Sequence, residues 1–340
     1  MAVQTETDVR AWLRDDFGLD ARSLDAVRAG AGERACTWRA ATDAGPFAVR
    51  WSSGGSPGGL EAAAAITRRL PPAPPLAPPA AAVVAAPRRT RTGALWAERC
   101  GGRLAVTAWL DGPRALDVAL TPPQWTAFGR LLARAHAVDP LSAPHLPRTD
   151  FRPGPALVAF DAADAAAASP VADELAVEAG VLWQAARHRL LEVRGRSIRV
   201  GARLQALLRD DPRSVPLVVC HGDPHLGNLV VTGPRDVALV DWDDAVLAPP
   251  EHDLMFLLGG VLAYAPVTAE QAAGFFTGYG RVEIDPDRLA YATCVRAMVD
   301  VADLALAALD PRRSDAERAS ALDLLAGALS RTGIVDLALG

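Results

Sequence analysis

The hydrophobic period changes along this chain near residue 110, and that change constrains its fold most strongly. Before it, residues 24–51 and 94–109 form short segments that alternate apolar and polar side chains, which is the period of β-strands. One strong helix former, residues 60–70, lies between these segments. Beyond the change, apolar residues mostly recur at helical spacing, with a few short strands among them. The pattern predicts an α+β protein with a small β-rich lobe and a larger helical lobe.

Length and cysteine content narrow the class of protein further. A chain of 340 residues, 50% of them hydrophobic, is long enough for about two domains with a substantial core. Its four cysteines form no CxxC pair, which argues against a disulfide framework or structural zinc site and favours the reducing cytoplasm. We also expect no signal peptide and no membrane span, because no suitable apolar run is present.

The basic residues are all arginine, since the sequence contains no lysine. This excludes Schiff-base and pyridoxal-phosphate chemistry and a Walker A loop, which need a lysine. The net charge of −5 argues against a nucleic-acid partner. Residues 1–220 hold 27 Arg against 22 Asp and Glu, whereas residues 221–340 hold 8 against 18. A cationic ligand or metal ions in the second part is one interpretation, and ordinary solvated faces are the other.

Two neighbouring motifs carry the densest set of chemically useful side chains. Residues 221–228 read HGDPHLGN and follow a strand, and residues 240–244 read VDWDD and follow a hairpin. So many converging carboxylates repel one another unless a cation compensates them. Asn and Asp oxygens suit Mg²⁺, and an Asp that holds no metal can accept a proton from a hydroxyl group.

HGDPHLGN followed by VDWDD resembles the aminoglycoside phosphotransferase family, a branch of the protein-kinase-like fold, and the resemblance covers nearly the whole chain. LTPPQW…GRLLARAH and APPEHDLMF are similar to its spectinomycin phosphotransferase branch. The resemblance implies a bilobal fold, with the N-lobe at 1–112, the helical C-lobe at 113–340 and a hinge at about 107–112.

The same resemblance implies roles for the two motifs, because the spacing of Asp223 and Asn228 matches the kinase catalytic loop H-R-D-x-x-x-x-N. Asp223 would then be the catalytic base. Asn228 and Asp241 would hold Mg²⁺. Backbone groups of Ala108 and Leu110, in the hinge, would bind the edge of the nucleotide base.

The N-terminal part supports this interpretation through its own residues. Ala48-Val49-Arg50 matches the kinase Ala-x-Lys strand, and alternation places Ala48 and Arg50 on one face. Arg50 replaces the usual Lys but can still bind phosphate through its fork of donors. Glu61 matches the carboxylate that pairs with this base, and the turn at Gly30 and Gly32 would cover the phosphates.

The function implied by the resemblance is transfer of the γ-phosphoryl group of ATP or GTP to a hydroxyl of a small-molecule antibiotic, which confers resistance. An aminoglycoside-like or aminocyclitol-like acceptor would be held by Asp243, Asp244 and Glu251. Nucleoside or peptide antibiotics, and metabolites of the choline, homoserine or methylthioribose type, are the alternative acceptors. We expect no nucleic-acid partner, and a monomer or homodimer.

Three other classes of protein match parts of the sequence. Residues 30–35 match the GxGxxA pattern of a dinucleotide fold, but CTWRAAT behind them alternates like a strand where that fold needs a helix. His221, Asp223 and His225 could be the metal triad of a hydrolase, which stoichiometric zinc would reveal. An inactive kinase fold used as a binding module would lack nucleotide turnover.

Overall fold

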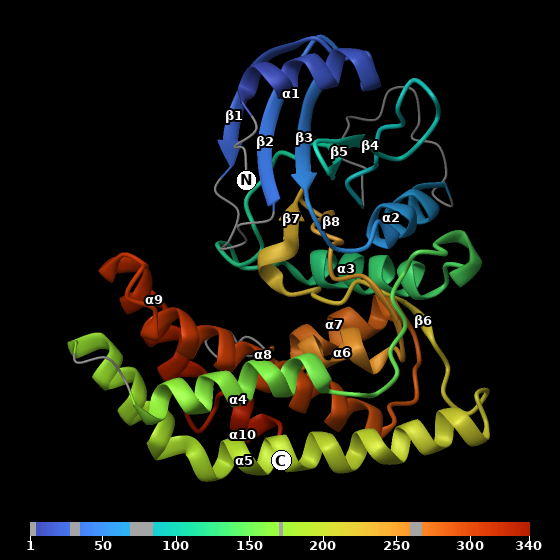
Figure 1. Ribbon diagram of the computed structural model, residues 1–340. Helices are drawn as coiled ribbons and strands as arrows, with labels where there is room; N and C mark the ends of the chain where they lie inside the picture. The colour runs from blue at the N-terminus through green and yellow to red at the C-terminus, as the bar shows by residue number, and fades with distance from the viewer. Residues whose placement is uncertain (1–4, 28–34, 69–83, 170–172, 259–266) are drawn as a thin grey trace. The chain divides into compact units, whose positions relative to one another are not determined.

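The contacts within the computed structural model divide the chain into two compact units (Figure 1). Unit 1 comprises Met1–Pro147, His221–Leu247 and Gly274–Gly280, and unit 2 comprises Arg148–Cys220, Ala248–Ala273 and Arg281–Gly340. The structure describes residues 5–27, 35–68, 84–169, 173–258 and 267–340. Neither unit begins or ends at residue 112, so the lobe boundary expected there stays a prediction.

A five-stranded antiparallel sheet is the main element of unit 1, and its strand order is β1-β2-β3-β5-β4. Its strands are β1 (Ala21–Val27), β2 (Ala35–Thr42), β3 (Gly45–Ser52), β4 (Ala97–Arg99) and β5 (Gly102–Ala108). Helix α1 (Glu6–Trp12) and the π-helical turn η1 (Leu13–Phe17) supply side chains to the core on one face of this sheet.

The two faces of β3 differ in chemistry, as the alternation of its residues predicts. Val49 and Trp51 are buried in the core beneath α1, and Phe47 packs against it. Ala48 and Arg50 point to the opposite face, because side chains alternate along a strand. The sheet therefore leaves one face for a site.

The remaining elements of unit 1 connect this face to the motifs. They are α2 (Gly58–Arg68), α3 (Pro122–His136), η3 (Pro140–Ser142), η4 (Leu226–Asn228), and the antiparallel hairpin of β7 (Leu229–Val231) and β8 (Val237–Leu239). Helix α3 begins after Thr121, which forms a capping box with Gln124, as expected for a Thr at this position. Strand β9 (Val246–Ala248) and helix α7 (Ala269–Tyr279) each cross the boundary between the units.

Unit 2 is mainly helical, with α8 packing against α4, α5, α6, α9 and α10. Its elements are α4 (Gly154–Ala168), α5 (Glu174–Asp210), β6 (Val218–Cys220), α6 (Glu251–Leu258), α8 (Pro286–Leu309), α9 (Asp315–Ala328) and α10 (Ile334–Leu337). Within the described ranges, none of the helices is both long and apolar enough to span a bilayer.

One carboxylate between α4 and α5 makes the stability of unit 2 depend on pH. Asp164 accepts hydrogen bonds from Arg187 at 2.8 and 2.9 Å and from Trp183 Nε1 at 2.8 Å. The Arg187 bonds, followed by the Trp183 bond, lower the pKa of Asp164 below its ordinary value. A depressed pKa in the folded state stabilises the protein above the unfolded pKa, near 4, and this stabilisation disappears as the pH falls through the folded pKa.

We therefore expect Asp164→Asn to lower the melting temperature at pH 7 and to have a smaller effect near pH 2. Thermal unfolding of both proteins across this range measures the difference. Asp161→Asn is the matched control, because Asp161 pairs with Arg194 on the same two helices but is 57% exposed. An equal deficit of Asp164→Asn at both pH values would contradict the expectation.

Candidate active site

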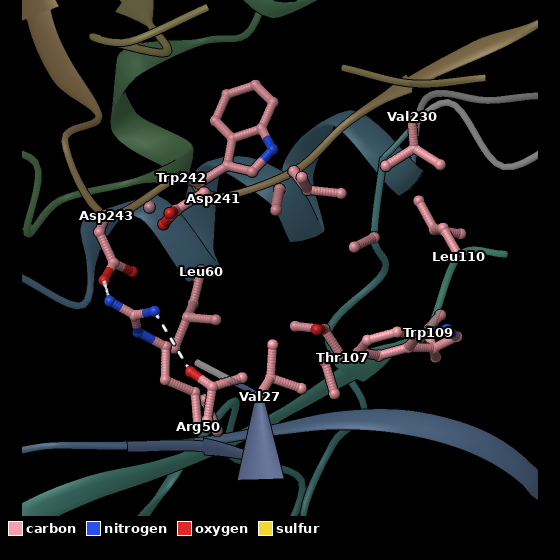
Figure 2. A pocket seen from close by; sticks show the side chains of 18 of the residues that line it. Val27, Arg50, Leu60, Thr107, Trp109, Leu110, Val230, Asp241, Trp242 and Asp243 are labelled. Atoms are coloured by element: carbon pink, nitrogen blue, oxygen red, sulfur yellow. Dashed lines mark hydrogen bonds and ion pairs between the residues drawn. The ribbon is translucent and has the colours of Figure 1, made fainter. Parts of the chain in front are cut away.

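A pocket of about 350 Å³ lies on the open face of the sheet, and all of its lining residues belong to unit 1 (Figure 2). Alternate residues of neighbouring strands form its floor: Val27, Thr37, Ala48, Arg50, Ser52, Arg103, Ala105 and Thr107. One wall comes from α2 and another from the segment after β8, which includes Asp241 and Asp243. The floor thus has an apolar part, formed by Val27, Ala48 and Ala105, and arginine and carboxylate side chains lie at one side of the pocket.

The expected hinge lies in the same pocket, since Ala108, Trp109 and Leu110 all line it. The Ala108 N–H donates to Ala86 O at 3.1 Å, and the Trp109 N–H donates to Pro46 O at 3.2 Å. Among the described residues, the Leu110 N–H has no hydrogen-bond partner. It is therefore available to a ligand beside the apolar floor. The other expected nucleotide contacts, Gly30 and Gly32, lie outside the described residues.

Arg50 extends from β3 along one side of the pocket, and its guanidinium forms an ion pair with the Asp243 carboxylate (Figure 2). Its Nη1 donates to Thr37 Oγ1 at 3.5 Å, and its buried Nε has no hydrogen-bond partner among the described residues. Burial raises the pKa of Asp243, while Arg50 opposes this effect and Asp241 adds to it.

The expected pairing of Arg50 with Glu61 is wrong for this structure. Both oxygens of the Glu61 carboxylate are taken by His145, whose backbone N–H donates to Oε2 at 3.1 Å and whose Nδ1 lies 2.7 Å from Oε1. The Ser56 hydroxyl also donates to the His145 carbonyl, which ties the start of α2 to the same loop. Glu61 therefore anchors α2 instead of facing phosphate.

His221 connects the two motifs through its ring. Its Nε2 lies 3.0 Å from Val240 O, and its Nδ1 accepts the Asp223 N–H at 3.2 Å. The ring also packs edge-on against Trp242, with centroids 4.6 Å apart. Gly222, next to it, has a φ of 89° and approaches Asp244 O so closely that a Cβ would lie 2.1 Å from that atom. His221 thus braces the loop, as expected for a buried histidine.

Asp223 and Asn228 lie together at the end of this loop. Asn228 Nδ2 donates to Asp223 O at 2.9 Å and lies 3.3 Å from Asp223 Oδ2. His225 Nε2 is also 3.3 Å from Asp223 Oδ2, while its Nδ1 accepts the Gly227 N–H. The Asp223 side chain is only 17% exposed, so these contacts hold it in one orientation.

Asp241 lines the pocket and has a φ of 62°, a left-handed conformation that is uncommon for a residue with a Cβ. The Val240 N–H donates to Asn228 O at 3.0 Å, which places the Asp241 and Asn228 segments side by side. Because Asn228 Nδ2 is used by Asp223, its Oδ1 is the atom left for a cation. A carboxylate and an amide oxygen fit Mg²⁺ by their chemistry.

Residues 25–292 match the model of the Phosphotransferase enzyme family. The chain belongs to this family. The match includes the expected hinge, the HGDPHLGN loop and the VDWDD segment, so the resemblance seen in the sequence is confirmed. No curated protein matches the chain.

Solved structures of phosphotransferases share its fold. Spectinomycin phosphotransferase APH(9)-Ia in complex with ADP and spectinomycin is 19% identical, with a TM-score of 0.81 over 100% of this chain and 99% of that one. Its AMP-bound complex is 18% identical, with a TM-score of 0.76 over 98% of each chain. Aminoglycoside phosphotransferase APH(4)-Ia is 14% identical, with a TM-score of 0.53 over 97% of this chain and 99% of that one. The expected α+β, bilobal kinase-like fold is confirmed.

Two of the acidic residues expected to hold the acceptor have other partners in this phosphotransferase. Glu251 is fully buried, and its carboxylate accepts hydrogen bonds from Arg288 and from the Asp285 N–H. It cannot reach a ligand, so its assignment to the acceptor is wrong. Asp243 lines the pocket and pairs with Arg50, whereas Asp244 is exposed and stays a prediction.

The hydrolase triad of His221, Asp223 and His225 gains no support from the geometry. Both nitrogens of the His221 ring already contact backbone groups, so a metal would have to displace the contacts that brace the loop. His225 Nδ1 is likewise taken by the Gly227 N–H.

Sequence reasoning missed Arg103 and Arg114, which also line the pocket. Arg103 Nη2 donates to the carbonyls of Gly54 and Gly55 at 2.6 and 2.7 Å. The signal was available for Arg103, because it alternates with Ala105 and Thr107 along the predicted strand and so shares their face.

Helix α2 approaches the VDWDD segment closely at Gly59, and a substitution of Gly59 tests this contact. A Cβ there would lie 1.9 Å from Trp242 O. We expect Gly59→Ala to destabilise the protein by about 1–3 kcal/mol, because α2 or the segment must shift. Gly327→Ala, in α9, meets nothing within 4 Å and should be neutral or stabilising by up to about 1 kcal/mol. Chemical denaturation of both variants measures the contrast, and equal stabilities would contradict it.

Proposed function

We propose that this phosphotransferase moves the γ-phosphoryl group of a purine nucleoside triphosphate to a hydroxyl of a small-molecule antibiotic. One observation carries the proposal. A single pocket contains the hinge backbone, Arg50 and Asp241, and the Asp241 segment is hydrogen-bonded to the loop that holds Asp223 and Asn228. Phosphoryl transfer needs these groups together, because its catalysis depends on positioning and on charge stabilisation.

Each group has a distinct task in this proposal. The apolar floor accepts the base, and the Leu110 N–H with the Ala108 backbone binds its edge. Arg50 binds the phosphates as a bidentate donor. Asp223 orients the acceptor hydroxyl and takes its proton as the oxygen attacks phosphorus.

Asn228 and Asp241 would hold Mg²⁺, which supplies neutralisation of the phosphate charge when it is bound. His221 keeps these two residues in place through its contacts with the Asp223 and Val240 backbones. The turn at Gly30 and Gly32 would cover the phosphates, as the resemblance implies.

The acceptor is proposed to be an aminocyclitol or aminoglycoside. The first support is the fold shared with spectinomycin phosphotransferase APH(9)-Ia, whose structure contains spectinomycin. The second is the excess of acidic residues in positions 221–340, which favours an aminated molecule. Asp244 is the remaining acidic residue that we assign to its amino groups. We also propose that the enzyme acts in the reducing cytoplasm and is a monomer or a homodimer.

A panel of acceptors with ATP and with GTP tests the proposal. The enzyme is incubated separately with spectinomycin, hygromycin B, a nucleoside antibiotic, a peptide antibiotic, choline, homoserine and methylthioribose. Mass spectrometry then measures the masses of the products. We expect the mass of one phosphate to be added to an aminocyclitol or aminoglycoside. Addition to a metabolite alone would contradict the antibiotic acceptor, and stoichiometric zinc without nucleotide turnover would contradict phosphoryl transfer.

A further inference from the structure

The ion pair between Arg50 and Asp243 joins two parts of the proposed site that are far apart in the sequence. Arg50 comes from β3, at the floor of the pocket, and Asp243 comes from the segment that also carries Asp241. Figure 2 shows the Asp243 carboxylate directed at the guanidinium from the wall opposite the hinge. Asp243 is thus the carboxylate that contacts the end of Arg50 in this structure.

No other carboxylate takes this role among the residues that the structure describes. Glu61 has both oxygens occupied by His145, and its side chain is 11% exposed. Asp241 and Arg103 are the other charged groups that act on Asp243. Arg103 has its own partners in the Gly54 and Gly55 carbonyls, so it does not replace Arg50 as the donor.

Arginine suits this arrangement better than the lysine of related kinases. A guanidinium has donors on two edges, so one edge can stay on Asp243 while the other edge contacts phosphate. In this structure Nη2 is on Asp243, Nη1 is on Thr37 at the weak distance of 3.5 Å, and Nε has no partner among the described residues. A lysine ammonium offers no such planar fork.

We propose that Asp243 is a positioning residue that orients Arg50 toward the nucleotide phosphates, in the role expected of Glu61. The proposal rests on the function proposed above. Asp243 also brings a negative charge close to the phosphates, and this charge opposes their binding. Asp243 therefore improves the placement of Arg50 at some cost in nucleotide affinity.

The two effects predict opposite changes in Asp243→Asn. Turnover at saturating substrates should fall by roughly ten- to a hundredfold, because a mobile guanidinium is misplaced in the transition state. Binding of fluorescent methylanthraniloyl-ADP in EDTA should tighten by roughly two- to fivefold, the range typical of a partly exposed charge. EDTA removes any contribution of Asp243 through a metal ion, so the binding change reports on the Asp243 charge near the phosphates, and the Arg50→Gln background tests its coupling to Arg50.

Arg50→Gln provides the test of coupling. In that background Asp243→Asn should leave kcat unchanged, since no guanidinium remains to be oriented. Asp16→Asn is the matched control, because Asp16 forms an ion pair with Arg99 at 2.6 Å in the same unit but does not line the pocket. It should alter neither kcat nor the affinity for the labelled ADP.

Each result decides the proposal. Lower kcat with tighter ADP binding in EDTA, both in Asp243→Asn, supports it. The proposal is overturned if Asp243→Asn binds the labelled ADP in EDTA more weakly than the wild type, or equally well. If the variant binds the labelled ADP less well only when Mg²⁺ is present, Asp243 is assigned to the metal site instead. A kcat loss that persists in the Arg50→Gln background also overturns it. A wild-type enzyme that binds no nucleotide would instead contradict the proposed function itself.

Discussion

Asp223→Asn should reduce kcat by about 10²–10⁴-fold, the range expected when a positioned general base is lost. An amide cannot take the proton of the acceptor hydroxyl, yet it has nearly the same shape as the carboxylate. Asn228 Nδ2 still finds Asp223 O at 2.9 Å, because that bond is to the backbone. The fold and the nucleotide affinity should therefore be preserved, and steady-state kinetics with a nucleotide titration measure both quantities.

Asp236→Asn is the control for this substitution. Asp236 lies in the turn between β7 and β8, is exposed and does not line the pocket, so the variant should keep wild-type kcat. Wild-type turnover in Asp223→Asn would remove Asp223 from the proposed mechanism. A large loss of nucleotide affinity together with kcat would instead show a structural defect.

Asp241→Asn should lower turnover by at least about 10³-fold, since metal-ion stabilisation of charge in the transition state is worth several kcal/mol. Asp241 matters most because, of the two residues that would hold Mg²⁺, it supplies the charged carboxylate and Asn228 supplies only a neutral oxygen. The variant should also lose the increase in ADP affinity that Mg²⁺ produces in the wild type.

ADP binding in EDTA separates this effect from misfolding. In the absence of metal, Asp241→Asn should bind ADP at least as well as the wild type, because a negative charge near the phosphates has been removed. The interpretation fails if the wild-type enzyme, freed of divalent cations by EDTA, keeps its full turnover. It also fails if the variant retains the Mg²⁺ response.

The position of α2 does not depend on Arg50, because Arg50 pairs with Asp243 and not with Glu61 of this helix. Glu61 is bound to His145, and Gly59 approaches Trp242 O more closely than any residue with a Cβ could. Helix α2 is therefore held by packing and by the loop at His145, whereas Arg50 is held by Asp243. The position of α2 and the orientation of Arg50 are consequently separate features in this phosphotransferase.

Features that depend on neighbours in the sequence could be predicted from the sequence alone. The period of two along β3 places Ala48 and Arg50 opposite Val49 and Trp51, because alternation is a property of any extended backbone. The spacing within HGDPHLGN likewise brings Asn228 back to Asp223, since a loop of this length closes on itself through the Asn228 side chain. Family and fold class follow from these local patterns.

Partners of charged groups were decided only by the tertiary structure. Glu61 and Asp243 are both plausible counter-ions for Arg50, and Glu61 was excluded by His145, a residue 84 positions away. Glu251 is excluded from the acceptor site because its carboxylate binds Arg288, which lies 37 positions further along the chain. A carboxylate pairs with whichever hydrogen-bond donor the packing brings within about 3 Å, and this depends on long-range contacts that no local pattern of residues encodes.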